Sequence, residues 1–135
     1  MKKLLIVLLI LALLVGGGVA AFKTLPAPRT LGASARFSEA EIAEGAKLAE
    51  KQVKHFSGLL RIFRVTYDEE KGNDFLEGDF AEGRRTPENT MIFFVDFATG
   101  GRTTALNPWD VYTDYAVILT RESSDAPFEV TGSGY

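Results

Sequence analysis

The sequence predicts an α+β domain that follows an N-terminal membrane helix. Residues 37–58 have the apolar periodicity of one amphipathic helix, and four later runs are rich in β-branched and aromatic residues. A helix followed by consecutive strands is typical of α+β proteins, whereas α/β proteins alternate the two elements. We therefore expect one amphipathic helix packed on a curved antiparallel sheet of about four strands.

Residues 1–22 have the composition of a membrane-directed segment. Lys2 and Lys3 precede nineteen uncharged residues, 4–22. As a helix these would span about 28 Å, close to the roughly 30 Å of a bilayer's hydrocarbon core, which favours a transmembrane anchor. A cleaved signal peptide is the alternative, because residues 4–15 form a compact apolar region and residues 19–21 offer small side chains for cleavage.

Both interpretations place the rest of the chain outside the cytoplasm, since the two N-terminal lysines favour the cytoplasmic side. We expect a single-pass protein of the cell membrane with its C-terminal domain outside, or a protein secreted after cleavage. Residues 23–36, with two prolines and a glycine, predict a flexible linker. Residues 37–135 then form the extracytoplasmic domain.

The charge of the exported part limits the classes of partner that it is expected to bind. Residues 36–135 carry 11 Lys and Arg against 18 Asp and Glu, a net charge of −7. Nucleic acid binding needs a basic footprint, so nucleic acid is not an expected partner. Tight adhesion of the domain to an anionic membrane is disfavoured for the same reason. The chain has no Cys, which excludes disulfides and lipid attachment through an N-terminal cysteine.

The predicted helix has a clear start. Ser38 is a natural N-cap and Glu41 completes a capping box, while the residues on either side of this box have the spacing of a hydrophobic staple. Gly58 is expected to end the helix. One apolar stripe runs along it, made of Ile42, Ala46, Ala49, Val53 and Phe56.

Four runs predict the strands: residues 59–67, 90–97, 114–122 and 128–132. The run 90–97 is apolar at nearly every position, which suggests a central strand covered on both faces. Arg61 and Arg64 interrupt the first run and would lie on opposite faces of a regular strand. The polar residues 68–89 form a long loop or contain a short helix near residues 75–81.

Residues 100–115 are the candidate binding loop. They lie between two predicted strands and contain the only Trp of the chain. Aromatic area provides affinity and carboxylates provide orientation in such loops. The alternative is that Trp109 folds back and caps the open end of the sheet. The candidate binding residues are Trp109, Asp110, Tyr112, Asp114 and Tyr115.

An enzyme is the alternative function. Asp96 interrupts the most apolar run, and a carboxylate in an apolar pocket has a raised pKa and can act as a general base. Tyr67 or Tyr112 would then serve as a hydrogen-bond donor. In the other interpretation, Asp96 ends its strand at the solvent and caps the following turn.

We expect no cofactor and no metal site. P-loop, Rossmann and nucleophile-elbow motifs are absent from the sequence. With one His and no Cys, a zinc site would depend almost wholly on carboxylates. The acidic residues of 68–79 do not follow the EF-hand spacing and are expected to be solvated.

The segments ENTMIFFVDF, GG, ALNPWDVYTDYAVILTRES and SGY resemble a family of small exported domains of unknown function from Gram-positive bacteria. FSEAEI and VTYDEEK extend the resemblance over residues 37–135, and its most specific part is the Leu106-Asn107-Pro108 turn followed by residues 112–115. Members of that family often carry a Cys near residues 57–58, where this chain has none, so no redox role is implied. The resemblance implies a cystatin-like or NTF2-like fold and no mechanism.

The leading hypothesis is a non-catalytic extracytoplasmic binding domain, attached to the membrane through residues 4–22. Its partner would be a protein, a peptide or a small molecule outside the cytoplasm. The alternative is a small NTF2-like enzyme with Asp96 as general base.

Overall fold

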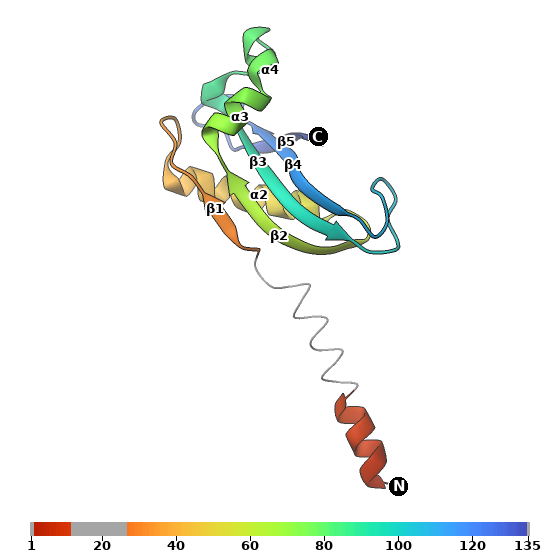
Figure 1. Ribbon diagram of the computed structural model, residues 1–135. Coiled ribbons are helices and arrows are strands. Elements are labelled where there is room, and N and C mark those ends of the chain that lie inside the picture. Colours follow the sequence, from red (N-terminus) through yellow and green to blue (C-terminus); the bar gives the residue numbers. More distant parts are fainter. Residues whose placement is uncertain (1, 12–26, 135) are drawn as a thin grey trace.

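The computed structural model describes residues 2–11 and 27–134. Residues 2–11 form a helix (Figure 1). Its apolar side chains are exposed. The predicted membrane segment, residues 4–22, lies mostly outside the described residues. Within the two described ranges, no helix is both long and apolar enough to cross a bilayer.

Residues 27–134 form an α+β domain around one mixed sheet, with strand order β1-β2-β3-β4-β5 (Figure 1). The strands β2 to β5 are antiparallel neighbours, as predicted. The prediction of about four antiparallel strands was wrong in one respect, because a fifth strand, β1, pairs parallel to β2. The strands are β1 (Arg29–Leu31), β2 (Leu59–Tyr67), β3 (Thr90–Thr99), β4 (Val111–Thr120) and β5 (Glu129–Gly134).

Strand β1 falls in residues 23–36, which the sequence predicts to be a flexible linker. All three of its residues are exposed, so they lack the apolar alternation by which a strand is recognised. Backbone hydrogen bonds hold the segment instead: the Val65 N–H donates to the Pro28 carbonyl at 2.9 Å, and the Gly32 N–H donates to the Tyr67 carbonyl at 2.9 Å. Ala27 is already buried, so the folded domain begins there at the latest.

Helix α2 (Glu39–Lys54) confirms the predicted helix and contacts all five strands. The Ser38 hydroxyl accepts from the Glu41 N–H at 3.2 Å, and the Glu41 carboxylate accepts from the Ser38 N–H at 3.1 Å, which is the predicted capping box. The helix ends at Lys54 with His55 as C-cap, so Gly58 lies in the turn to β2. The helical stripe is buried in the main core with the inward residues of β3, namely Met91, Phe93, Val95 and Phe97.

The outer face of the sheet, opposite α2, is covered only at one end. The polar connection forms α3 (Glu69–Phe75), α4 (Glu77–Ala81) and the 3-10 helix η1 (Pro87–Asn89), so the predicted short helix is present and a second one precedes it. Figure 1 shows α3 and α4 at the end of the sheet that lies away from the β3–β4 loop. They cover a smaller core cluster of Leu76, Ile92, Phe94, Ala116 and Ile118.

Two bulges rearrange the first half of β2. Leu60 and Phe63 are each an extra residue relative to β3. As a result Arg61 and Arg64 both lie opposite outward-facing residues of β3. The prediction that these arginines lie on opposite faces was wrong, since a bulge breaks the strict alternation of a regular strand.

A buried carboxylate fastens the start of the domain to α2. Glu50 is 6% exposed, and its carboxylate contacts Arg29 Nη2 at 3.0 Å, Lys54 Nζ at 3.1 Å and the Ala27 N–H at 3.4 Å. Burial on its own raises the pKa of the Glu50 carboxyl, but the hydrogen bonds from Arg29, Lys54 and Ala27 outweigh burial and hold the pKa below its usual value.

We predict that Glu50→Gln weakens the acid dependence of stability. A carboxyl whose pKa is lowered on folding stabilises the protein fully above its unfolded pKa of about 4.3, and this stabilisation is lost as the pH falls through the lower folded-state pKa. The variant should lose about 1–3 kcal/mol of unfolding free energy at pH 7 and progressively less at lower pH. Urea unfolding from pH 7 to pH 3 measures this difference.

Glu44→Gln is the matched control, because Glu44 lies on the exposed side of α2 in an ion pair with Lys47. Its unfolding free energy should follow that of the wild type at every pH. A constant offset between Glu50→Gln and the wild type over the whole pH range would contradict the proposed role of Glu50.

Candidate functional site

The loop of residues 100–110 is fixed at its base by Thr99, the buried last residue of β3. The Thr99 hydroxyl donates to the Asn107 carbonyl at 2.6 Å and accepts from the Asp110 N–H at 3.0 Å. The Gly100 N–H donates to the Gly58 carbonyl at 2.8 Å, which ties the loop to the turn after α2. These bonds fasten the base of the loop to the end of β3 and to the turn after α2.

Trp109 projects from this loop and is 77% exposed. Its backbone is left-handed, with φ of 52°, and its N–H donates to the Gly100 carbonyl at 3.0 Å. The indole lies over Gly101, where an added Cβ would come within 3.0 Å of the ring. The interpretation that Trp109 caps the sheet was therefore wrong; Leu106 packs against the main core in its place, and the Tyr112 hydroxyl accepts a loop N–H at 2.8 Å.

The structure does not bring the five predicted binding residues together. Tyr112 and Tyr115 belong to β4 and are buried on the α2 side, with ring centroids 4.9 Å and 5.3 Å from that of Phe97. Asp110 accepts from the first N–H of β4 at 2.8 Å and so caps that strand. The sequence pattern did not predict this arrangement, because β4 begins at Val111, three residues before the start of the predicted strand 114–122.

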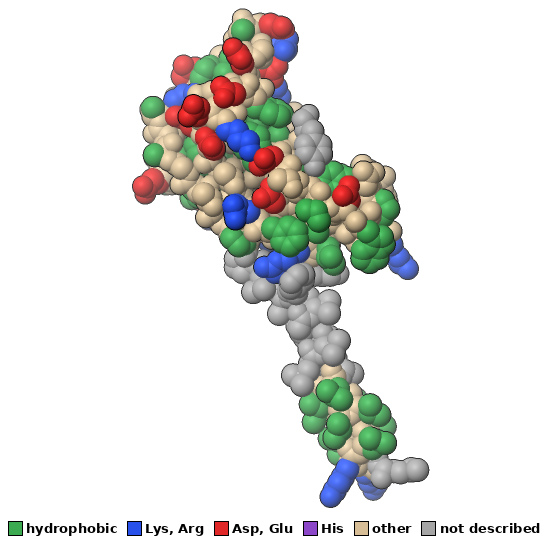
Figure 2. All heavy atoms as spheres, in the orientation of Figure 1, with side chains coloured by type: hydrophobic (Ala, Val, Ile, Leu, Met, Phe, Trp, Pro, Cys, Tyr) green, Lys and Arg blue, Asp and Glu red, His purple; other side chains and the backbone are tan. Residues whose placement is uncertain are grey.

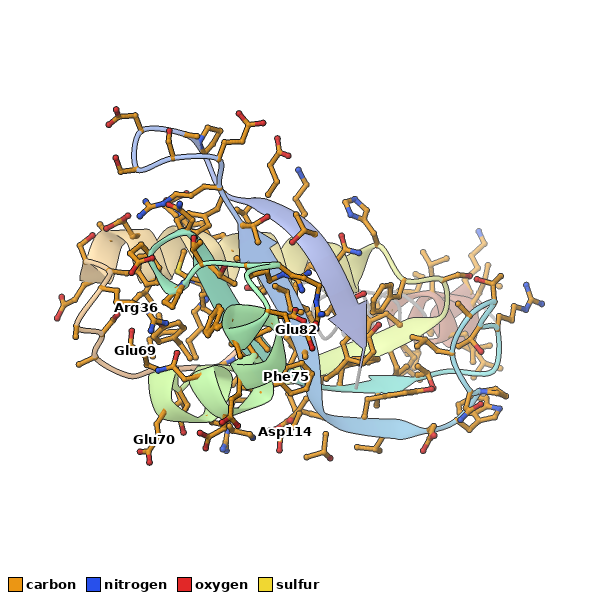
Figure 3. All side chains as sticks on the ribbon, turned by 90° about the horizontal axis from the view of Figure 1, so that it is seen from above. Arg36, Glu69, Glu70, Phe75, Glu82 and Asp114 are labelled. Carbon is orange, nitrogen blue, oxygen red and sulfur yellow. The ribbon has the colours of Figure 1, made fainter. Side chains whose placement is uncertain are left out.

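Asp114 lies on the outer face, in a β-bulge of β4 where its φ is 55°. Its N–H donates to the Asp96 carboxylate at 2.8 Å, and its own carboxylate pairs with Lys71 Nζ of α3 at 2.8 Å. Figure 3 shows Asp114 beside the Phe75 end of α3. The bulge leaves the Asp114 N–H without a partner in the regular hydrogen-bond pattern of the sheet, and the Asp96 carboxylate accepts from it. Asp96 therefore does not cap the turn after its strand.

The predicted catalytic set is divided between the two faces of the sheet. Tyr67 and Tyr112 belong to the main core on the α2 side, whereas Asp96 alternates with inward residues of β3 and faces outward, half-buried. The Tyr67 hydroxyl donates to Glu69 at 3.1 Å, and burial raises the pKa of Tyr67. Glu69 is in turn held near Arg36, at 3.6 Å (Figure 3).

The end of the domain at the β3–β4 loop, which α3 and α4 leave uncovered, carries apolar side chains that we call the loop-end surface: Leu60, Phe63, Ala98, Trp109 and Val111, all of them exposed except Ala98. Val111 and Arg61 both lie opposite Ala98 on neighbouring strands, so the surface is continuous across β2, β3 and β4. Val111 is 61% exposed, Phe63 43% and Leu60 39%. Exposed apolar side chains gathered in this way mark contact sites. The sequence showed Trp109, but the bulges that present Leu60 and Phe63 left no recognisable pattern.

Charge is distributed unevenly over the domain. Residues 59–64 and 96–114, which include the loop-end surface, carry three Arg against three Asp. The other described residues of the domain carry nine Lys and Arg against fifteen Asp and Glu. Figure 2 shows the acidic side chains gathered mainly around the α3–α4 end and the hydrophobic ones at the loop end.

A groove of about 610 Å³ lies between residues 83–90 and the ends of β4 and β5. Its arginines already have acidic partners: Arg84 and Arg85 pair with Asp79, and Arg121 pairs with Glu41 at 2.8 Å. Among the described residues, no group of three or more His, Asp or Glu side chains is placed to hold a metal ion. The loop-end surface is therefore the better candidate for function.

No protein family model, curated protein or solved structure matches the chain. The resemblance to small exported domains, and the cystatin-like or NTF2-like fold that it implies, remain predictions.

We predict that Gly58→Ala disturbs the loop. Gly58 has φ of 80°, and an added Cβ would lie 2.0 Å from the Arg102 carbonyl oxygen. The left-handed backbone alone costs about 1–2 kcal/mol, and the clash with the loop backbone adds to this cost. Thermal unfolding and the emission spectrum of Trp109, the only Trp, measure both effects.

Gly83→Ala is the matched control, because Gly83 has φ of 72° but open space around it. It should show the backbone cost without any change in Trp109 emission. Equal stability losses in the two variants, with Trp109 emission unchanged in both, would show that Gly58 does not position the loop.

Proposed function

We propose that the chain is a non-catalytic binding domain, held outside the cytoplasm at a membrane by its N-terminal segment. The loop-end surface is the site at which it contacts its partner. The observation that carries this proposal is Trp109, which is 77% exposed on a loop fixed by internal hydrogen bonds.

The rigidity of the loop favours binding. Association costs the ordering of loops and side chains at an interface, and a loop that is already ordered avoids much of that cost. Tryptophan is the residue type most enriched among the side chains that dominate binding energy. Trp109 is free to fill this role because Leu106, and not Trp109, packs against the core.

The N-terminal segment supports the proposed location. Residues 4–22 are uncharged and follow two lysines, which favours an orientation with the domain outside. The resemblance to exported domains agrees with this placement.

We predict that Trp109→Ala abolishes binding and leaves stability nearly unchanged. An exposed side chain contributes about 0.5 kcal/mol or less to folding. A photo-reactive phenylalanine analogue at Val111 should form adducts in intact cells, and Trp109→Ala in the same chain should remove most of them. Adduct yield and thermal unfolding are the two measurements.

Two controls separate contact from structure. The same analogue at Glu77, on exposed α4, should form no such adduct. Leu106→Ala should lower the melting temperature, because Leu106 packs against the core. Adducts of equal yield at positions 77 and 111, or a large stability loss in Trp109→Ala, would refute the proposal.

A further inference from the structure

The tether between the predicted membrane segment and the domain is short. Residues 23–36 would reach about 50 Å if they were a free linker. However, Ala27 is buried and hydrogen-bonded to Glu50, and β1 begins at Arg29.

With a membrane segment that ends at Phe22, only residues 23–26 separate it from the folded domain, and the distance from Phe22 to Ala27 is at most about 18 Å. A domain of this size has a radius of gyration of about 13 Å. Some part of its surface must therefore stay close to the bilayer.

The chain joins the domain next to the loop-end surface. The Pro28 carbonyl accepts from the Val65 N–H, and β1 then runs parallel to β2, from Val65 towards Tyr67. Phe63 and Arg64 are therefore the two residues of β2 that directly precede Val65, where β1 joins the sheet. Figure 1 shows the start of β1 on the side of the sheet away from α3 and α4.

The loop-end surface has the composition of a membrane-interface contact. Tryptophan prefers the headgroup region of a bilayer, where its ring is partly apolar and partly hydrogen-bonded. Leu60, Phe63 and Val111 add aliphatic and aromatic area beside it. Arginine keeps its charged group at the headgroups while its methylene stem lies on apolar surface, and Arg64 stands on this face because of the bulges.

The distribution of charge agrees with this orientation. The net charge of −7 in residues 36–135 argues against adhesion to an anionic membrane only if it is spread evenly. Here the segments that carry the loop-end surface have no net charge, and the rest of the domain has an excess of six negative charges. Anionic lipid would repel the second part and not the first, which turns the α3–α4 end away from the bilayer.

We infer that the partner of the loop-end surface is the lipid surface of the membrane to which the chain is attached. This inference rests on the proposed function and on a membrane-embedded N-terminal segment. Attachment raises the effective concentration of lipid at the loop-end surface, so a weak contact is sufficient to keep the domain on the bilayer. The domain then lies on the bilayer with Trp109 at the headgroups and its acidic end exposed.

The test uses the full chain reconstituted into vesicles of phosphatidylcholine and phosphatidylglycerol. Trp109 is the only Trp, so its emission reports this position alone. Lipids with acyl chains brominated close to the headgroup should quench Trp109. In a control variant, Trp109→Phe with Phe75→Trp, the probe moves to the exposed Phe75 of α3 and should not be quenched.

Charge variants test the electrostatic part. A basic residue near an anionic surface contributes a factor of about five to its association, so Arg64→Gln should lower the ratio of docked to undocked domain about fivefold in these vesicles. It should have no effect in phosphatidylcholine alone. Lys47→Gln, on the exposed side of α2 and away from the loop-end surface, should have no effect in either lipid.

Failure of the chain to float with vesicles, or equal Trp109 emission in brominated and plain vesicles, would overturn the inference. A protein adduct at position 111 in cells, with no quenching of Trp109 by lipid, would overturn it and leave the binding domain in place. If there is neither an adduct nor quenching, the proposed function fails as well.

Discussion

The packing of α2 across all five strands is the constraint on which the rest of the structure depends. Its apolar stripe occupies the inner face of the sheet together with Phe93 and Phe97 of β3, both fully buried. The aromatic rings of Tyr112 and Tyr115 pack on the same face and belong to the same core. The short helices α3 and α4 cover only one end of the other face, so the part that is left for contact with another molecule lies at the β3–β4 loop.

Irregular strands determine what this remaining face presents. Without the bulges at Leu60 and Phe63, the alternation of β2 would direct one of its two arginines into the main core. The bulge of β4 allows Tyr112 and Tyr115, three residues apart, to face inward together. Asp96 binds the N–H of Asp114 there, so a carboxylate that resembled a general base in the sequence supports the backbone.

Local patterns were sufficient to predict much of the fold. The capping box at Ser38 predicted the start of α2, and apolar runs predicted β2 to β5, because both depend on residues that are close in sequence. Strand β1 was not predictable, since three exposed residues pair only through their backbone. The candidate site was predicted at Trp109 alone. Its other members depend on the register between strands, which is decided by the packing of the whole sheet.

The attachment of Ala27 and Arg29 to Glu50 also has a mechanical consequence. A pull on the polypeptide from its N-terminal side acts first on Ala27, whose N–H and neighbouring Arg29 are both held by a carboxylate of α2. The same segment is hydrogen-bonded to β2 at Pro28 and at Gly32. Tension is therefore shared between the long helix and the sheet, and β1 cannot separate from β2 without also breaking the partly buried ion pair of Arg29 and Glu50.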